Sequence, residues 1–147
     1  MTDRVFAPFG VLVLRVALGV MFLAHSLLLK LVVLTLPGTA EHFASIGLPG
    51  WLGYVVFAAE AVGGALLVLG VQARWVALAL SPILLGATWA HWANGWLFLA
   101  EGGGWEYPAY LFVLCVVQVL LGDGAYALRP SRGLAAMPSR GAASHPA

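Results

Sequence analysis

Four long apolar stretches dominate the chain, and they limit it to one structural class. The stretches cover about residues 9–34, 51–71, 75–93 and 105–121. A helix needs roughly 20 apolar residues to cross the hydrocarbon core of a bilayer. Only 9% of the 147 residues are charged, whereas soluble domains carry about 25%, so the charges cannot cover a water-facing surface. We therefore predict an all-α integral membrane protein that folds as a four-helix transmembrane bundle.

Turn-forming segments separate the four predicted spans, and residues 1–128 are predicted to form one membrane domain. The remaining residues, 129–147, are rich in Pro, Ser, Gly and Ala and are predicted to form a flexible cytoplasmic tail. We expect the first span to stay uncleaved, because Arg15 interrupts its apolar run and the run continues to about Leu34. The separating segments are Leu36-Pro37-Gly38, Leu48-Pro49-Gly50, Asn94-Gly95 and Gly102-Gly103-Gly104.

Basic residues gather on one side of the predicted bundle. Four spans place both termini on that side, together with Arg4, Arg74, Arg129, Arg132 and Arg140. The two loops on the other side carry Glu41, Glu101 and Glu106, and they contain no Lys or Arg. The positive-inside rule then predicts that both termini are cytoplasmic. We expect a multi-pass protein of the inner (plasma) membrane.

Five ionisable side chains lie inside the predicted spans: Arg15, His25, Lys30, Glu60 and His91. A charge at membrane depth is costly unless it is paired or wetted, so such residues point to functional sites. Helical spacing places each of them on or beside the polar or small-residue face of its span, which favours packing toward the bundle interior. The helical rise puts Glu60 and His25 near mid-membrane and His91 within about one turn of the outer surface.

These residues predict a site that exchanges protons with a bound ligand. Glu60, His91 and His25 are the predicted catalytic groups, because carboxylates and imidazoles can carry protons where water reaches them. A quinone head group fits such a set, whereas haem is disfavoured because His91 is expected about 10 Å above His25. No metal site is predicted, since no span contains two ligands three or four residues apart. The predicted ligand-binding residues are Arg15, Lys30, Trp92, Glu106 and Tyr107.

A purely structural interpretation of the same residues stays open. Glu60 would then pair with Arg15 or Lys30 only to fix helix register. His91 would be an interfacial histidine bonded to a loop carbonyl. His42 and His145 are predicted to be solvated, in a loop and in the tail.

Charge and cysteine content exclude other classes. The formal net charge is +1 and the seven Lys and Arg residues form no patch, so nucleic acid is not an expected partner. The single Cys115 excludes a disulfide framework or a CxxC redox pair within one chain. The lipid bilayer is the expected partner, and a homo-oligomer is compatible with the pattern.

From about Leu12 to Leu128 the sequence resembles the DoxX family of small four-span membrane proteins. The matching pieces include Leu14-Arg15-Val16-Ala17-Leu18-Gly19, Phe22-Leu23-Ala24-His25, Lys30, Ala59-Glu60, Gly63-Gly64 and Leu121-Gly122-Asp123-Gly124-Ala125-Tyr126. In that family the lysine more often falls four residues after the histidine, whereas here Lys30 is five residues after His25. On an α-helix the extra residue would rotate Lys30 by about 100°, away from His25 and toward the face of Arg15.

The resemblance implies a membrane subunit related to thiosulfate:quinone oxidoreductase, or to redox complexes that handle oxidative and thiol stress. Membrane or extracytoplasmic redox proteins are the partners that it implies. The first hypothesis is therefore a redox-associated subunit that binds quinone, and whether the chain is itself an enzyme stays open. The alternative is a non-catalytic scaffold or anchor for such a complex. A small-molecule or proton carrier is a third class, disfavoured because the chain shows no inverted repeat.

Overall fold

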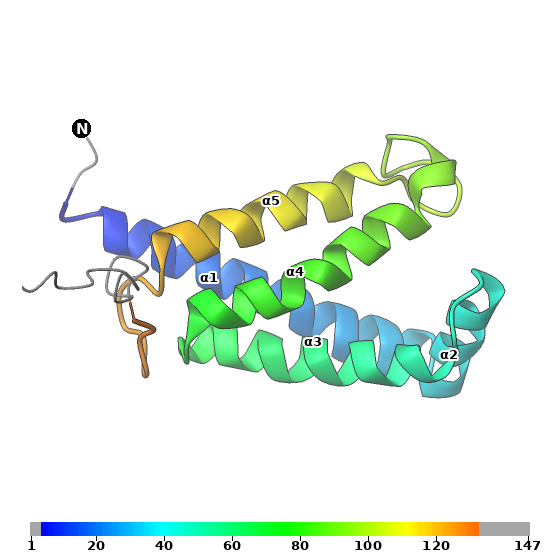
Figure 1. The fold of residues 1–147 in the computed structure, drawn as a ribbon, viewed down its shortest axis with the longest axis horizontal. Coiled ribbons are helices and arrows are strands. Elements are labelled where there is room, and N and C mark those ends of the chain that lie inside the picture. The colour runs from blue at the N-terminus through cyan, green and yellow to red at the C-terminus, as the bar shows by residue number, and fades with distance from the viewer. Residues whose placement is uncertain (1–3, 133–147) are drawn as a thin grey trace, which may run out of the picture.

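A computed structural model describes residues 4–132, and these residues form an all-helical bundle (Figure 1). The elements are α1 (Ala7–Leu23), the π-helix η1 (Ala24–Val33), α2 (Leu36–Ser45), α3 (Trp51–Leu69), α4 (Ala73–Ala90), the short 3-10 helix η2 (Trp92–Asn94) and α5 (Glu106–Leu121). The N-terminus and the segment after α5 lie at one end of the bundle, which we call the terminal end. Helix α2 and the loop between α4 and α5 lie at the other end, which we call the loop end.

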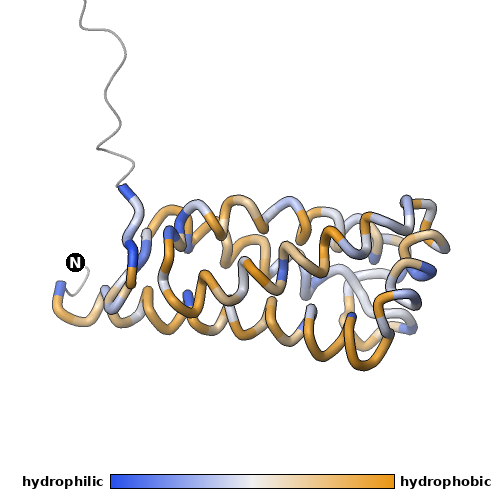
Figure 2. Tube along the Cα trace, turned by 90° about the horizontal axis from the view of Figure 1, so that it is seen from below, coloured by the Kyte–Doolittle hydropathy of each residue, from blue (hydrophilic) through white to orange (hydrophobic). Residues whose placement is uncertain are grey.

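Three of the helical stretches are long and apolar enough to cross a membrane. They are the continuous stretch Ala7–Val33, made of α1 and η1, and the helices α3 and α4. Figure 2 shows that most of the helical length is hydrophobic. The prediction of an all-helical, multi-pass membrane protein is confirmed, and the predicted spans match the observed helices to within a few residues. Helix α5 is also apolar but shorter, at 16 residues.

Residues 36–45 form helix α2, which corrects the prediction of a loop there. Pro37 occupies the first turn, where a missing N–H costs nothing. The Thr35 hydroxyl caps the helix by accepting a hydrogen bond from the Gly38 N–H at 3.3 Å. The helix lies close against the start of α3, because a methyl group added at Gly53 would lie 3.2 Å from the Thr39 side chain. His42 is therefore a helical residue and not part of an open loop.

The first span changes its winding at Ala24. From there to Val33 the backbone is a π-helix, in which each N–H bonds to the carbonyl five residues earlier, as Leu34 does to Leu29 at 2.9 Å. Near the start of this segment the Ser26 hydroxyl donates to the Phe22 carbonyl at 3.0 Å. Residues five apart therefore follow one another along the helix surface, whereas in an α-helix they would diverge.

Glycines bring α1 and α3 into backbone contact. A methyl group added at Gly64 would lie 2.9 Å from the Gly19 carbonyl oxygen, and one added at Gly19 would lie 2.7 Å from that of Gly64. Helices in a bilayer gain little from the hydrophobic effect between them, so close packing of small residues is a main source of association. Beside this contact lies the buried core, which includes Leu18, Phe22, Leu67, Leu80 and Cys115.

Two buried arginines hold the terminal end together. Arg15 is 1% exposed and donates to the Asp123 carbonyl at 2.6 Å. Arg74 is also buried and donates to the Val119 carbonyl, in the last turn of α5. Helix ends leave carbonyls unpaired and carry partial negative charge, so guanidinium groups stabilise them. Arg15 therefore acts at the end of the bundle and not beside Glu60.

The chain after α5 folds back over the terminal end. The Arg129 N–H donates to the Gly70 carbonyl at 3.1 Å, and the Arg129 carbonyl accepts from the Gln72 N–H at 2.8 Å. The Asp123 carboxylate accepts from the Ser131 N–H at 2.9 Å. Ordered packing thus continues past the predicted start of the tail. The rest of the predicted tail, with Arg140 and His145, lies outside the described residues.

We predict that Gly64→Ala destabilises the protein, because the new methyl group meets backbone that cannot move without separating α1 from α3. Overpacking of this kind costs about 1–3 kcal/mol of unfolding free energy. Gly86→Ala is the matched control, since a methyl group there meets nothing within 4 Å. Thermal unfolding in detergent should show a lower midpoint for Gly64→Ala only, and equal midpoints would contradict the proposed backbone contact.

Candidate functional site

A cavity of about 490 Å³ lies toward the loop end of the bundle. Its walls come from α1, η1, α2, α3, α4 and α5, and most of them are apolar side chains. Cavities of this size hold small-molecule ligands, usually with a few polar groups that orient them. The polar or ionisable residues that line it are His25, Lys30, Thr39, His42, Glu60, His91 and Tyr107.

The cavity exists because α3 and α4 pack tightly at one level and separate beyond it. A methyl group added at Gly63 would lie 2.8 Å from Leu80, so the two helices touch there. Two residues further along α4, Pro82 cannot donate to the Leu78 carbonyl. The Ser81 hydroxyl donates to that carbonyl instead, at 2.8 Å. From this point α4 and α5 diverge from α3 toward the loop end (Figure 1).

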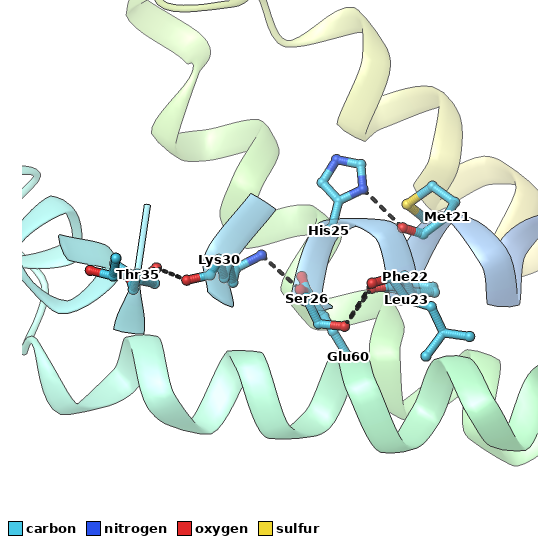
Figure 3. Close-up of polar contacts among 9 residues, drawn as sticks. Met21, Phe22, Leu23, His25, Ser26, Lys30, Thr35 and Glu60 are labelled. Atoms are coloured by element: carbon cyan, nitrogen blue, oxygen red, sulfur yellow. Dashed lines mark hydrogen bonds and ion pairs between the residues drawn. The ribbon is translucent and has the colours of Figure 1, made fainter. Parts of the chain in front are cut away.

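Lys30 and Glu60 form a buried ion pair in the cavity wall. The Lys30 ammonium lies 2.7 Å from Glu60 Oε2, and the two side chains are 12% and 6% exposed. Figure 3 shows them reaching toward one another from η1 and α3. The Thr39 hydroxyl donates to the Lys30 carbonyl at 3.1 Å, which ties α2 to the same residue. Removal of either partner of such a buried pair would leave the other charge buried without a partner, which is strongly destabilising.

His25 lines the cavity and uses one ring nitrogen to bond to its own helix. Its Nδ1 lies 3.0 Å from the Met21 carbonyl oxygen (Figure 3). Since a carbonyl can only accept, Nδ1 carries the proton in the neutral ring, and Nε2 is left with a free lone pair. The ring also stacks on Tyr107, with centroids 6.0 Å apart and planes inclined by 22°. This pair bridges the first span and α5.

The winding of η1 overturns one expectation about Lys30. The spacing from His25 predicted that Lys30 would turn away and join the face of Arg15. Because five residues make about one π-helical turn, Lys30 and His25 both line the cavity instead. Arg15 is bound to the Asp123 carbonyl at the terminal end. Of the two partners considered for Glu60, the structure therefore selects Lys30.

His91 lies at the edge of the cavity and bonds to the loop. Its Nδ1 is 3.1 Å from the carbonyl oxygens of both Gly102 and Gly103. That is the geometry expected for an interfacial histidine that holds a loop, although the ring also lines the cavity. His42 is exposed, as predicted, although it belongs to α2 and also lines the cavity. Its helix could have been found from Pro37 in the first turn after a capping threonine.

Two predicted ligand-binding residues organise the loop instead of lining the cavity. Trp92 is 62% exposed and stacks on Trp105, with centroids 4.7 Å apart. The Glu106 carboxylate accepts a hydrogen bond from the Phe98 N–H at 2.8 Å. Tyr107, another predicted ligand-binding residue, lines the cavity, and its role in ligand binding stays a prediction. Within residues 4–132, no group of three or more His, Cys, Asp or Glu side chains is placed to hold a metal ion.

Comparison with known proteins gives matches over about half of the chain. The family model described as DoxX matches residues 10–92, a stretch that contains His25, Lys30, Glu60 and His91. A Bacillus subtilis (strain 168) protein named "Putative oxidoreductase CatD" is 38% identical over 78 residues. These residues make up 53% of this chain and 56% of that protein, so the chain spans about half the length of this relative. No solved structure matches.

We predict strong energetic coupling between Lys30 and Glu60. Lys30→Met or Glu60→Leu alone should each lower the unfolding free energy by about 3–5 kcal/mol, because each leaves an unpaired buried charge. The double variant should recover most of that loss, since two apolar side chains replace the pair. Denaturation of the four proteins in detergent measures the coupling. Additive losses in the double variant would show that the pair contributes nothing as a unit.

Proposed function

The chain belongs to the DoxX family, and we propose that it is a redox-associated membrane subunit whose cavity binds a quinone. The observation that carries this proposal is the combination of a large apolar cavity with one buried ion pair and one histidine acceptor in its walls. Apolar walls suit a substituted ring, and the few polar groups suit its oxygens. The name of the Bacillus subtilis relative, an oxidoreductase, supports the same class of function.

The polar groups match the two ends of a quinone ring. The ring oxygens lie on opposite sides, and the two polar groups assigned to them, Lys30 and His25, are five residues apart on η1. The Lys30 ammonium has hydrogen atoms beyond the one that it shares with Glu60, so it can donate to a quinone oxygen. His25 Nε2 can accept the hydroxyl hydrogen of a quinol. Tyr107, stacked on His25, offers a flat apolar surface beside the ring.

Proton exchange in this proposal falls to Glu60 and His25. Reduction of a quinone to a quinol takes up two electrons and two protons. Glu60, as a carboxylate, and His25, through Nε2, each first take up a proton that enters from the loop end and then pass it to a quinone oxygen. His42 and His91 line the same cavity and can relay protons between the loop end and the ring. The electrons come from a membrane or extracytoplasmic redox partner. This chain then supplies the binding site and the protons.

The proposal predicts that bound quinone depends on Glu60 and His25. Protein purified in mild detergent should release a quinone on solvent extraction, measured by chromatography. Glu60→Gln and His25→Gln should lose most of it, because Gln approximates the size of each side chain but not its proton chemistry. Only the monodisperse, folded fraction of each variant is compared, since Glu60→Gln leaves Lys30 unpaired. Glu106→Gln is the control, since Glu106 bonds to the loop and does not line the cavity. Equal quinone content in all four proteins would refute the assignment.

We also propose that four helices cross the membrane, α5 included, with both termini in the cytoplasm. Arg4, Arg129 and Arg132 lie at the terminal end, together with buried Arg74. Glu41, Glu101 and Glu106 belong to α2, the long loop and the start of α5, at the loop end. Lys and Arg are retained on the cytoplasmic side of membrane proteins, so the terminal end faces inward.

Cysteine labelling tests this orientation. Native Cys115 is buried and gives a low background. In intact cells a membrane-impermeant maleimide should label Glu101→Cys and should leave Arg132→Cys unlabelled until the membrane is opened. The reverse pattern would place the loop end in the cytoplasm.

A scaffold role is the second function that a specific feature favours. The loop after η2 exposes Leu97, Phe98 and Leu99, and Leu99 is 81% exposed. Consecutive exposed apolar side chains at a loop tip suit contact with a protein partner or with the bilayer surface. A pull-down in mild detergent that recovers no stoichiometric partner would count against this role.

A further inference from the structure

The cavity reaches the flank of the bundle along α4 and η1, and the exposed lining residues there are apolar. The other exposed lining residues, His42 and Tyr107, belong to α2 and to the first turn of α5. On α4, Pro82 and Gly86 line the cavity and are exposed. On η1, Leu29 and Leu34 line it and are each 39% exposed. The ion pair lies on the inner wall, where Glu60 is 6% exposed. Along α4 and η1 the cavity is thus apolar where it meets its surroundings, and its ion pair is buried on the inner wall.

Gly86 is the glycine of the cavity lining, and no packing contact requires it. Gly19, Gly63 and Gly64 each face a neighbour closer than 3 Å from an added methyl group, whereas Gly86 has nothing within 4 Å. A glycine inside a helix costs about 1 kcal/mol relative to alanine, and here no close contact between helices compensates. Its effect is to leave the flank of α4 open beside the cavity.

Helix α2 is held firmly across the loop end, so it does not act as a loose cover. Thr39 is 1% exposed, and its hydroxyl lies within hydrogen-bond distance of both the Lys30 and Thr35 carbonyls, at 3.1 and 2.9 Å. A methyl group added at Gly50 would lie 3.1 Å from the Ala40 carbonyl oxygen. The wide part of the cavity is therefore bounded by fixed structure at this end, and its exposed apolar lining lies on the flanks, with Pro82 and Gly86 on α4.

We propose that the ligand carries a long apolar tail that leaves the cavity sideways, past Gly86 and Pro82, and lies in the bilayer. This inference rests on the proposed function, which places a polar ring at Lys30, Glu60 and His25. The tail lies where the lining is apolar and exposed, and the ring lies where it is polar and buried. Gly86 is then a specificity-determining residue, because a side chain there would close the path of the tail and leave the ring site intact.

Two ligands distinguish the side opening from the ring site. One is ubiquinone with its full isoprenoid tail, and the other is the same ring with a hydrogen atom in place of the tail. Binding of each is measured on the full chain in lipid nanodiscs, for the unaltered protein, Gly86→Phe and Gly10→Phe. Gly10 is the matched control, since it also has nothing within 4 Å but does not line the cavity.

We expect Gly86→Phe to weaken binding of the long-tailed quinone by about tenfold or more, with the tail-less ring bound within about twofold of the unaltered protein. Gly10→Phe should change neither. Val56→Phe, in the part of the cavity wall that α3 forms, should have the same effect as Gly86→Phe. Agreement between the two variants would show that the effect does not come from misfolding of one of them. Equal losses for both ligands, or no loss in either wall variant, would overturn the side opening. Failure of the unaltered protein to bind either quinone would instead refute the proposed function.

Discussion

The ion pair between Lys30 and Glu60 is the contact on which the loop half of this bundle depends. It joins the π-helical end of the first span to α3, and Thr39 adds α2 through the carbonyl of the same lysine. In a bilayer no bulk water competes for these groups, so their attraction is strong and their separation costly. The buried ion pair therefore holds η1, α2 and α3 in one arrangement. A cavity wall that is to orient a ligand needs such a fixed arrangement.

The two ends of the bundle are stabilised by different interactions. The terminal half closes by contact, with Gly19 against Gly64 and Gly63 against Leu80, and with Arg15 and Arg74 bonded to carbonyls near the helix ends. The loop half is open, because Pro82 and the π-helix interrupt regular α-helical hydrogen bonding in α4 and in the first span. Tight packing at one end allows the other end to hold a cavity without loss of the fold.

Much of the fold could be predicted from the sequence, because apolar length and turn residues directly determine where membrane helices run. The burial of Glu60 beside a basic side chain also followed from the cost of charge at depth. The sequence could not identify which basic residue pairs with Glu60. Arg15 and Lys30 share a face only if the whole first span is α-helical, and part of it is a π-helix. Likewise α2 was missed because its apolar pattern is short, and the loop role of Glu106 depends on a backbone N–H that no sequence pattern reveals.

The π-helix separates two quantities that an α-helix ties together, the number of residues in a segment and the direction in which its side chains point. A turn of η1 contains more residues than an α-helical turn, so the segment stores surplus chain length. Because η1 runs for ten residues, this surplus is spread over about two turns. His25 and Lys30, five residues apart, can therefore line one cavity, whereas an α-helix would direct them to different faces.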